Sequence, residues 1–292
     1  MKFGVKDHNS SVKPLVYALQ ELGHQGVANE PDMILLDHDS PPFYRGVIDQ
    51  YPDARLVIYP HGEPFAFWWD GMWDTNPRTV GYLASSPGHA EVMRRYGYSK
   101  PIHEIGWYLS EIKAFSPAEN LNNVLFAPIH PLNNGFMNPV HKAANIAAYQ
   151  ALIKMPIKLT VRHLGNLPSN GLWPVDGVTY KQGAKDGSTD AADLVVANLG
   201  TYFTLNVAQG TPCVAYNQAE PPAGGHSTDT MLTAQNWDKY KDYVRYPYDL
   251  DDGYPALLAA SQMEAGAWKR RFIGEPLNIN NLDEAVRAVM NA

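Results

Sequence analysis

The fold is indicated most clearly by residues 124–161, which read VLFAPIHPLNNGFMNPVHKAANIAAYQALIKMPIKLTV. The stretch opens on one short apolar run, 124–127, and closes on another, 157–161, with a helical segment over about 139–153 between them. Two short apolar runs joined through a helix are typical of neighbouring parallel strands that are buried on both faces. This stretch therefore predicts an α/β protein with a mostly parallel sheet.

The same alternation continues in both directions along the chain. Further apolar runs predict strands at Val5 and at 33–36, 56–59, 79–84, 102–105, 194–197 and 212–216. Helical spacing predicts helices at about 11–23, 41–51, 87–96, 201–209, 254–272 and 282–291. The polar segment 107–122 contains Pro117 and separates two such halves. The sequence thus predicts two α/β domains.

Composition limits the class of protein. The chain has 292 residues, a net charge of -7 and dispersed basic residues, which argues against tight binding to a nucleic acid duplex. No run of 18 apolar residues and no signal-peptide pattern is present, so we expect no membrane span and a cytoplasmic location. The single cysteine, Cys213, lies in an apolar run and is expected to be a buried strand residue. Seven Trp and 17 Tyr favour a ligand site lined with aromatic rings.

Ligands of doubly wound domains gather beyond the carboxyl ends of parallel strands, so polar residues directly after apolar runs are the candidates for a site. In the first half, His61 follows the run 56–59 and precedes Gly62. A histidine in this place suits a general base that takes a proton from an acceptor hydroxyl, and Glu63 or Asp70 could orient it. The alternative is a histidine that caps a turn.

In the second half, three loops could hold a phosphate. His130, Asn134 and Gly135 lie in the loop after the first strand, and Arg162 and His163 end the next one. Arginine and histidine there could contact donor phosphates or stabilise a departing nucleotide diphosphate, or could form a plain salt bridge. A third group precedes or occupies the helix at 201–209, whose start could bind an anion or simply be capped by Thr201. It consists of Gly200, Thr201, Tyr202, Thr204 and Asn206.

Histidines and carboxylates show no spacing of a known metal motif, so no metal site and no cofactor are expected.

The order of several short motifs resembles the GT-B glycosyltransferase superfamily. The resemblance is nearest to its CDP-glycerol glycerophosphotransferase and capsule polysaccharide transferase branch and to the related UDP-N-acetylglucosamine 2-epimerases. The motifs are Pro60-His-Gly-Glu63, Val124-Leu-Phe-Ala-Pro128, Val161-Arg-His163, Ala191-Ala-Asp-Leu-Val-Val196 and Gly200-Thr201 up to Gly210-Thr-Pro212.

The resemblance implies two Rossmann-like domains that face each other across a cleft, an acceptor-side domain over 1–116 and a nucleotide-donor domain over 122–275. It also implies that a helix in 276–292 packs back on the first domain. His61 matches the base-like histidine of the family, His163 the phosphate-contacting histidine, and Thr201 and Thr204 the hydroxyl-rich donor loop.

The expected function is transfer of a sugar or polyol-phosphate from a UDP-sugar or CDP-linked donor to the hydroxyl of a saccharide or other acceptor, inverting and without metal. Three alternatives stay open: a UDP-sugar 2-epimerase, a viral-type transferase acting on DNA bases, and a non-catalytic nucleotide-sugar-binding protein. Asn206, where the family usually has a glutamate, keeps the last alternative open.

Overall fold

The computed structural model describes most of the chain, and it forms two compact units. Unit 1 comprises Met1–Glu111 and Arg270–Ala292, and unit 2 comprises Ile112–Lys269. The first crossing between the units therefore falls inside the predicted linker 107–122, and the second falls a few residues before the predicted boundary at 275. The described residues are 1–6, 12–36, 49–59, 76–96, 98–128, 139–163, 167–168, 171–183, 191–197, 201–216, 253–262 and 273–291.

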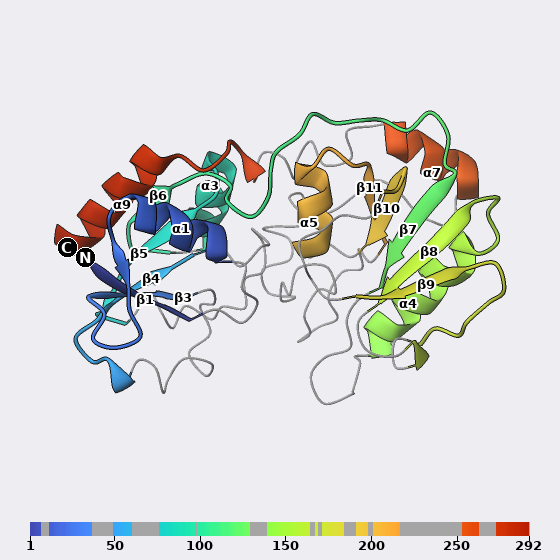
Figure 1. Cartoon of the computed structure of the whole chain (residues 1–292). Coiled ribbons are helices and arrows are strands. Elements are labelled where there is room, and N and C mark those ends of the chain that lie inside the picture. Colours follow the sequence, from blue (N-terminus) through green and yellow to red (C-terminus); the bar gives the residue numbers. More distant parts are fainter. Residues whose placement is uncertain are drawn as a thin grey trace. The chain divides into compact units, whose positions relative to one another are not determined.

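Unit 1 contains a six-stranded sheet in the order β2-β1-β3-β4-β5-β6, and all of its strand pairs are parallel (Figure 1). The chain steps from β1 to β2 on one side and then to β3 on the other, so the strand order reverses between β1 and β3. The strands are β1 (Lys2–Lys6), β2 (Gln25–Gly26), β3 (Met33–Leu36), β4 (Arg55–Ile58), β5 (Thr79–Ala84) and β6 (Ile102–Glu104). Its helices are α1 (Lys13–Glu21), α3 (Pro87–Tyr96) and α9 (Ile279–Asn291).

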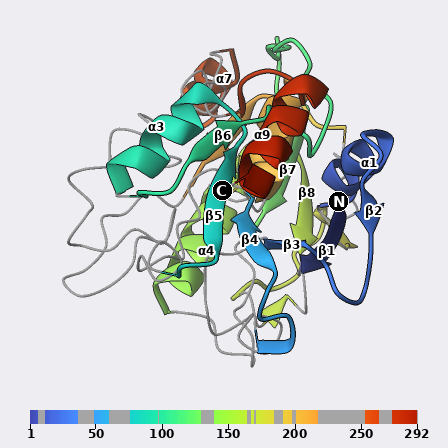
Figure 2. The ribbon, with the colours of Figure 1, turned by 90° about the vertical axis from the view of Figure 1, so that its left-hand side faces the viewer.

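The core of unit 1 joins the first and last helices of the chain. Leu15 and Leu19 of α1 and Leu282 and Val286 of α9 belong to one buried cluster with the sheet residues Phe3, Met33, Leu35, Val57 and Leu83. Figure 2 shows α9 lying in front of the strands of this unit. The C-terminal helix is thus part of the first unit, because its apolar face is needed to bury that side of the sheet.

Unit 2 contains a five-stranded parallel sheet in the order β11-β10-β7-β8-β9 (Figure 1). The chain runs outward through β7, β8 and β9 and then returns to the other side of β7, so the order reverses between β7 and β10. The strands are β7 (Asn123–Ala127), β8 (Lys158–His163), β9 (Thr179–Gln182), β10 (Leu194–Ala197) and β11 (Cys213–Ala215). Its helices are α4 (Pro139–Leu152), α5 (Thr201–Ala208) and α7 (Gly253–Gln262).

Side chains of the second sheet alternate between a face that packs on α4 and a face toward α5. Val124, Phe126, Leu159 and Val161 share a buried cluster with Tyr149 and Leu152 of α4. Residues at the intervening positions point to the opposite face, because successive strand residues alternate.

Close backbone contacts surround both chain crossings. Gly210 has φ of +77°, and a Cβ there would lie 2.8 Å from the carbonyl carbon of Ala114, in the outgoing segment. Gly274, on the returning segment, has φ of +70°, and a Cβ would lie 2.6 Å from Cβ of Ser86. Glycine is required at both positions because a side chain meets both the backbone penalty of positive φ and a steric clash.

Most predicted elements are confirmed, several with their bounds. The strands at 33–36, 79–84 and 194–197 and the helix at 87–96 match the structure residue for residue. β2 and β9 were not predicted, because they are short edge strands with mostly exposed residues and therefore contain no apolar run. The predicted helix 41–51 and the C-terminal part of the predicted helix 254–272 lie largely outside the described residues.

Within the described ranges, none of the helices is both long enough and apolar enough to cross a membrane.

Candidate functional site

The candidate site lies at the carboxyl edge of the sheet in unit 2, where the strand order reverses. The register pairs Phe126 with Val161 and Ala197 with Ala127, so β7, β8 and β10 end at nearly the same level. α5 begins at Thr201, shortly after the end of β10, and its N-terminus therefore lies next to the reversal. In doubly wound sheets this is the position at which ligands bind.

Two cationic side chains occupy neighbouring strands at this edge. Arg162 of β8 and Lys181 of β9 are register partners. Val161 and Tyr180, the residues just before Arg162 and Lys181, belong to the buried cluster that packs on α4, here called the α4-face cluster. Because successive strand residues point to opposite faces, Arg162 and Lys181 both point to the face toward α5. Two positive side chains therefore lie on one face of adjacent strands at this edge, and positive charge of this kind attracts anions.

Arg162 also contacts the first turn of α5. Its guanidinium carbon lies 5.9 Å from the ring centroid of Tyr202, within the range of a cation–π interaction. A Cβ on Gly183, just after β9, would lie 3.0 Å from Nη1 of Arg162, so this glycine leaves room for the guanidinium. The arginine is thereby held beside the start of α5, where backbone N–H groups and the helix dipole attract anions.

The remaining candidates on α5 are buried residues. Thr204 and Asn206 are fully buried. Asn206 donates from Nδ2 to the carbonyl oxygen of Tyr202 at 2.8 Å, and its buried Oδ1 has no hydrogen-bond partner among the described residues. A buried acceptor without a donor costs about 1–3 kcal/mol. The hydrogen bond from Nδ2 links Asn206 to Tyr202 one turn earlier in α5, while the oxygen without a donor carries the cost of its burial.

His163 is the next residue after Arg162 and therefore points to the other face of the sheet. It is buried, in line with Leu159 and Val161 of the α4-face cluster. Arg162 and His163 do end the strand as predicted, but the alternation places them on opposite faces, so they do not form one cationic pair.

Several predicted site residues lie outside the described residues: His61, Glu63, Asp70, His130, Asn134, Gly135 and Gly200. Their roles stay predictions. The segment with His61 directly follows Tyr59, at the carboxyl end of β4, and the segment with His130 follows β7 at the reversal. Lys181 was missed because β9 was missed; only the pairing of β8 with β9 reveals it.

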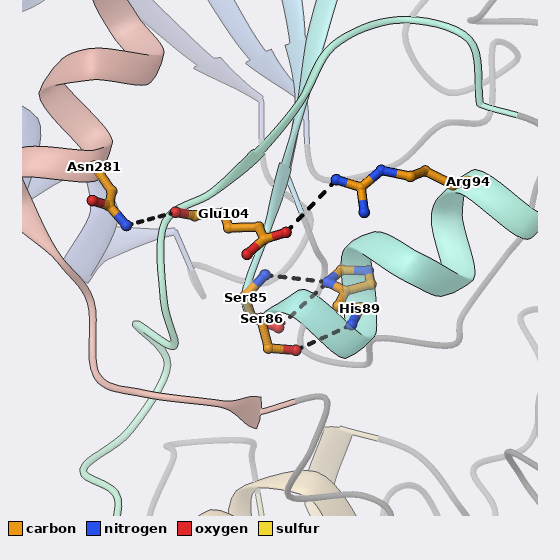
Figure 3. A network of polar contacts seen from close by, with 6 residues as sticks. All are labelled: Ser85, Ser86, His89, Arg94, Glu104 and Asn281. Carbon is orange, nitrogen blue, oxygen red and sulfur yellow. Dashed lines mark hydrogen bonds and ion pairs between the residues drawn. The ribbon is translucent and has the colours of Figure 1, made fainter.

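The described carboxyl edge of unit 1 has a different character. Ser85, Ser86 and His89, at the junction of β5 and α3, are all buried (Figure 3). Ser86 Oγ accepts from the backbone N–H of His89 at 3.1 Å, and Nδ1 of His89 accepts from the backbone N–H of Ser85 at 3.2 Å. The neutral ring therefore carries its proton on Nε2. These side chains complete the start of α3 with their own hydrogen bonds.

The described residues also bear on metal binding and on the cysteine. Among the described residues, no group of three or more His, Cys, Asp or Glu side chains could hold a metal ion. Cys213 is buried, as predicted, and its burial raises the pKa of the thiol, which opposes a role as nucleophile.

Comparison with protein-family profiles finds no match, and comparison with curated protein sequences finds none either. Solved structures do match. MurG of Acinetobacter baumannii has a TM-score of 0.50 at 13% identity, covering 100% of this chain and 99% of that one. The lipopolysaccharide outer core galactosyltransferase WaaB has a TM-score of 0.50 at 10% identity, again covering 100% of this chain and 99% of that one. These similarities, together with two parallel α/β units, show that the chain has the GT-B fold.

Proposed function

We propose that this protein is a glycosyltransferase that moves a sugar or polyol-phosphate from a nucleotide-activated donor to an acceptor hydroxyl. One observation carries the proposal: Arg162, the register partner of Lys181, lies beside the first turn of α5 at the carboxyl edge of unit 2, near the reversal of strand order. This is where a nucleotide diphosphate would find cations, the backbone N–H groups of a helix start and a favourable helix dipole. The structural similarity to WaaB, a lipopolysaccharide outer core galactosyltransferase, supports the same class.

If the transferred group is a sugar, the acceptor oxygen attacks its anomeric carbon, the bond from that carbon to the diphosphate oxygen breaks, and a nucleoside diphosphate leaves. If it is a polyol-phosphate, the acceptor oxygen attacks the phosphorus that bears the polyol, the bond to the bridging oxygen breaks, and a nucleoside monophosphate leaves. In both cases negative charge grows on the phosphate oxygen of the leaving nucleotide. Arg162 and Lys181 stabilise this charge, and they do so more strongly in the transition state than before bond breaking. With the cations supplied by the protein, the leaving group needs no metal, and the proposal includes metal-independent, inverting transfer.

The acceptor proton needs a base, and His61 is the residue proposed for it. A histidine whose pKa is near neutrality removes such a proton efficiently, typically for about two to four powers of ten in rate. Glu63 or Asp70 would orient the ring. On the donor side, the segment containing His130, Asn134 and Gly135 follows β7 and is proposed to add contacts to the diphosphate.

The donor site is tested by measuring the affinity of UDP, CDP, GDP and ADP for the unaltered chain and for Arg162→Met. Loss of hydrogen bonds to a charged group costs about 1.5–3 kcal/mol, so the preferred nucleotide should bind roughly 10 to 100 times more weakly. Methionine retains an apolar stem against Tyr202, and an unchanged melting temperature without nucleotide would show that the fold is intact.

Lys158→Met is the matched control, because Lys158 is exposed and lies at the opposite end of the same strand. It should leave nucleotide affinity unchanged. Failure of every nucleotide to bind, or equal losses in Arg162→Met and Lys158→Met, would contradict a diphosphate site at this edge.

Transfer and epimerisation are separated by NMR of the preferred nucleotide sugar incubated with protein and no acceptor. Conversion to the 2-epimer under these conditions would favour the epimerase. Turnover that appears only when a hydroxyl acceptor is added supports transfer, and binding without any turnover would favour the non-catalytic alternative.

A further inference from the structure

The loop between β8 and β9 exposes two large apolar side chains, one of them a tryptophan. Within the described ranges, the large apolar side chains that are exposed are Tyr17 at 61%, Trp173 at 68% and Val175 at 40%. Trp173 and Val175 are two residues apart in one loop. A single exposed apolar residue is ordinary, so exposure alone does not indicate a binding site; the contacts that hold the loop do.

The backbone on both sides of the indole is fixed by a chain of hydrogen bonds. The hydroxyl of Tyr149 donates to the carbonyl oxygen of Trp173 at 3.0 Å, and the backbone N–H of Val175 donates to the hydroxyl of Tyr180 at 2.7 Å. The two tyrosine hydroxyls are bonded to each other. Since Tyr149 donates to Trp173, it must accept from Tyr180, and the chain runs in one direction from Val175 to Trp173.

This chain requires that both hydroxyls keep their protons. Burial raises the pKa of Tyr149. Leu172, directly before the indole, is fully buried in the cluster that contains Tyr149. The loop is thus anchored by an apolar side chain and two hydroxyls, while the indole itself stays in water. A rigid aromatic ring loses little conformational entropy when it binds a ligand.

We propose that Trp173 is the platform of a saccharide-binding site. The apolar C–H face of a pyranose ring stacks on an indole, and its hydroxyls need polar partners at the rim. The exposed carboxylate of Asp176 lies three residues from the indole, beyond the exposed Pro174, and supplies an acceptor for such hydroxyls. A flat exposed ring with an exposed carboxylate in the same loop suits one or two sugar residues of a longer chain.

The size of the surface distinguishes a saccharide from a protein partner. The exposed parts of Trp173 and Val175 amount to about 200 Å² of apolar area, given the size of an aromatic side chain. A stable protein interface buries about 800 Å² on each partner. The area is therefore too small to form a second-copy interface alone, but it is enough to stack one or two sugar rings.

The saccharide site is separate from the proposed donor site. Tyr180 belongs to the cluster on the α4 face, whereas its neighbour Lys181 points to the α5 face with Arg162. The two sites thus lie on opposite faces of one sheet. The inference goes beyond the proposed transfer and can be tested without a nucleotide, so failure of one leaves the other untouched.

The test is a 19F NMR titration of the full chain labelled with 5-fluorotryptophan. The chain has seven tryptophans, so its spectrum is simple, and the Trp173 resonance is identified by its loss in Trp173→Phe. The probes are maltohexaose, cellohexaose, xylohexaose and chitohexaose at millimolar concentration. We expect a saturable shift of the Trp173 resonance with at least one of them.

Three variants sharpen the result. Trp173→Ala should weaken binding of the active hexasaccharide by about tenfold or more, since stacking is lost. Tyr17→Ala removes an equally exposed aromatic ring from unit 1 and should leave the affinity unchanged. Tyr149→Phe breaks the hydrogen-bond chain and should weaken binding by about threefold without altering which sugar is preferred.

Absence of a Trp173 shift with all four probes would overturn the proposal. So would equal affinity in Trp173→Ala and the unaltered chain. A Trp173 resonance that moves with protein concentration in the absence of sugar, together with a dimer in sedimentation that Trp173→Ala abolishes, would assign this surface to a second copy of the chain instead.

Discussion

The two units share one type of sheet but end it differently. Each sheet is entirely parallel and has one reversal of strand order. In unit 1 an arginine of the sheet, Arg55, donates from Nη1 to the carbonyl oxygens of Val289, at 3.0 Å, and Met290 at the end of α9. Arg55 is the first residue of β4 and so lies at the amino edge of its sheet, whereas Arg162 lies near the carboxyl end of β8, over the ring of Tyr202 and paired in register with Lys181.

This difference shows how one architecture separates stability from binding. Where unit 1 is described, its carboxyl edge is completed from within, by Ser85, Ser86 and His89, and the returning segment at Gly274 lies against Ser86. In unit 2, by contrast, Arg162 lies beside the first turn of α5, and Lys181 is its partner on the neighbouring strand. A cation that ends a helix stabilises the fold, whereas neighbouring cations at a helix start favour an anion.

The largest expected effect is the loss of the close packing at the edge of unit 1. Gly274→Ala should destabilise this unit by about 3 kcal/mol, because positive φ and a clash with Ser86 act together. Gly23→Ala is the matched control, since Gly23 also has positive φ, +80°, but has nothing within 4 Å of its Cβ position. Its cost should be about 1 kcal/mol.

Both costs can be measured by hydrogen exchange of the amides of β5 and α3. Equal losses of stability in Gly274→Ala and Gly23→Ala would show that the returning segment does not pack tightly on Ser86.

An effect of intermediate size is expected from replacing Arg55, and it should differ in kind from the effect of replacing Arg162. Arg55→Met should lower the stability of unit 1 by about 2 kcal/mol and loosen the end of α9, because the helix carbonyls lose a charged donor. Nucleotide affinity should not change. Arg287→Met removes an exposed ion pair with Asp283 on the same helix and should cost less than about 0.5 kcal/mol.

Hydrogen-exchange rates of the α9 amides measure the loss of stability, and calorimetric titration measures the nucleotide affinity. If Arg55→Met weakened nucleotide binding as much as Arg162→Met does, the division into a structural and a binding arginine would fail.

The smallest expected effect is a dependence of unit 1 on pH. Burial lowers the pKa of His103, and burial together with the N-terminal amino group and Arg287 lowers that of His24 against the opposing effect of Asp283. The unfolded chain therefore binds more protons, so stability is full above about pH 6.5, the ordinary histidine value, and falls as the pH drops below it.

Melting temperatures between pH 7.5 and pH 5 should decline less steeply in the double variant His24→Gln, His103→Gln than in the unaltered chain. Parallel curves would show that folding does not lower the pKa of His24 and His103.

Local patterns were enough to predict most strands of both sheets and to identify Arg162 as a candidate site residue. Apolar runs such as 33–36 and 194–197 identify central strands because burial on both faces excludes polar residues. Arg162 was found because it ends such a run. β9 could not be found in this way, since an edge strand satisfies its backbone through one neighbour and tolerates exposed residues. Lys181 was therefore invisible until β9 was paired with β8.

By itself, the sequence determined the class of fold and the strand ends at which a ligand site should be sought, because hydrophobic periodicity and chain order are local properties. Tertiary structure decided which side chains act together. It separated His163 from Arg162 by strand alternation, brought Lys181 to Arg162 by strand pairing, and joined Tyr149 and Tyr180 beneath Trp173. These are contacts between residues distant in sequence or opposite in face, which only packing can specify.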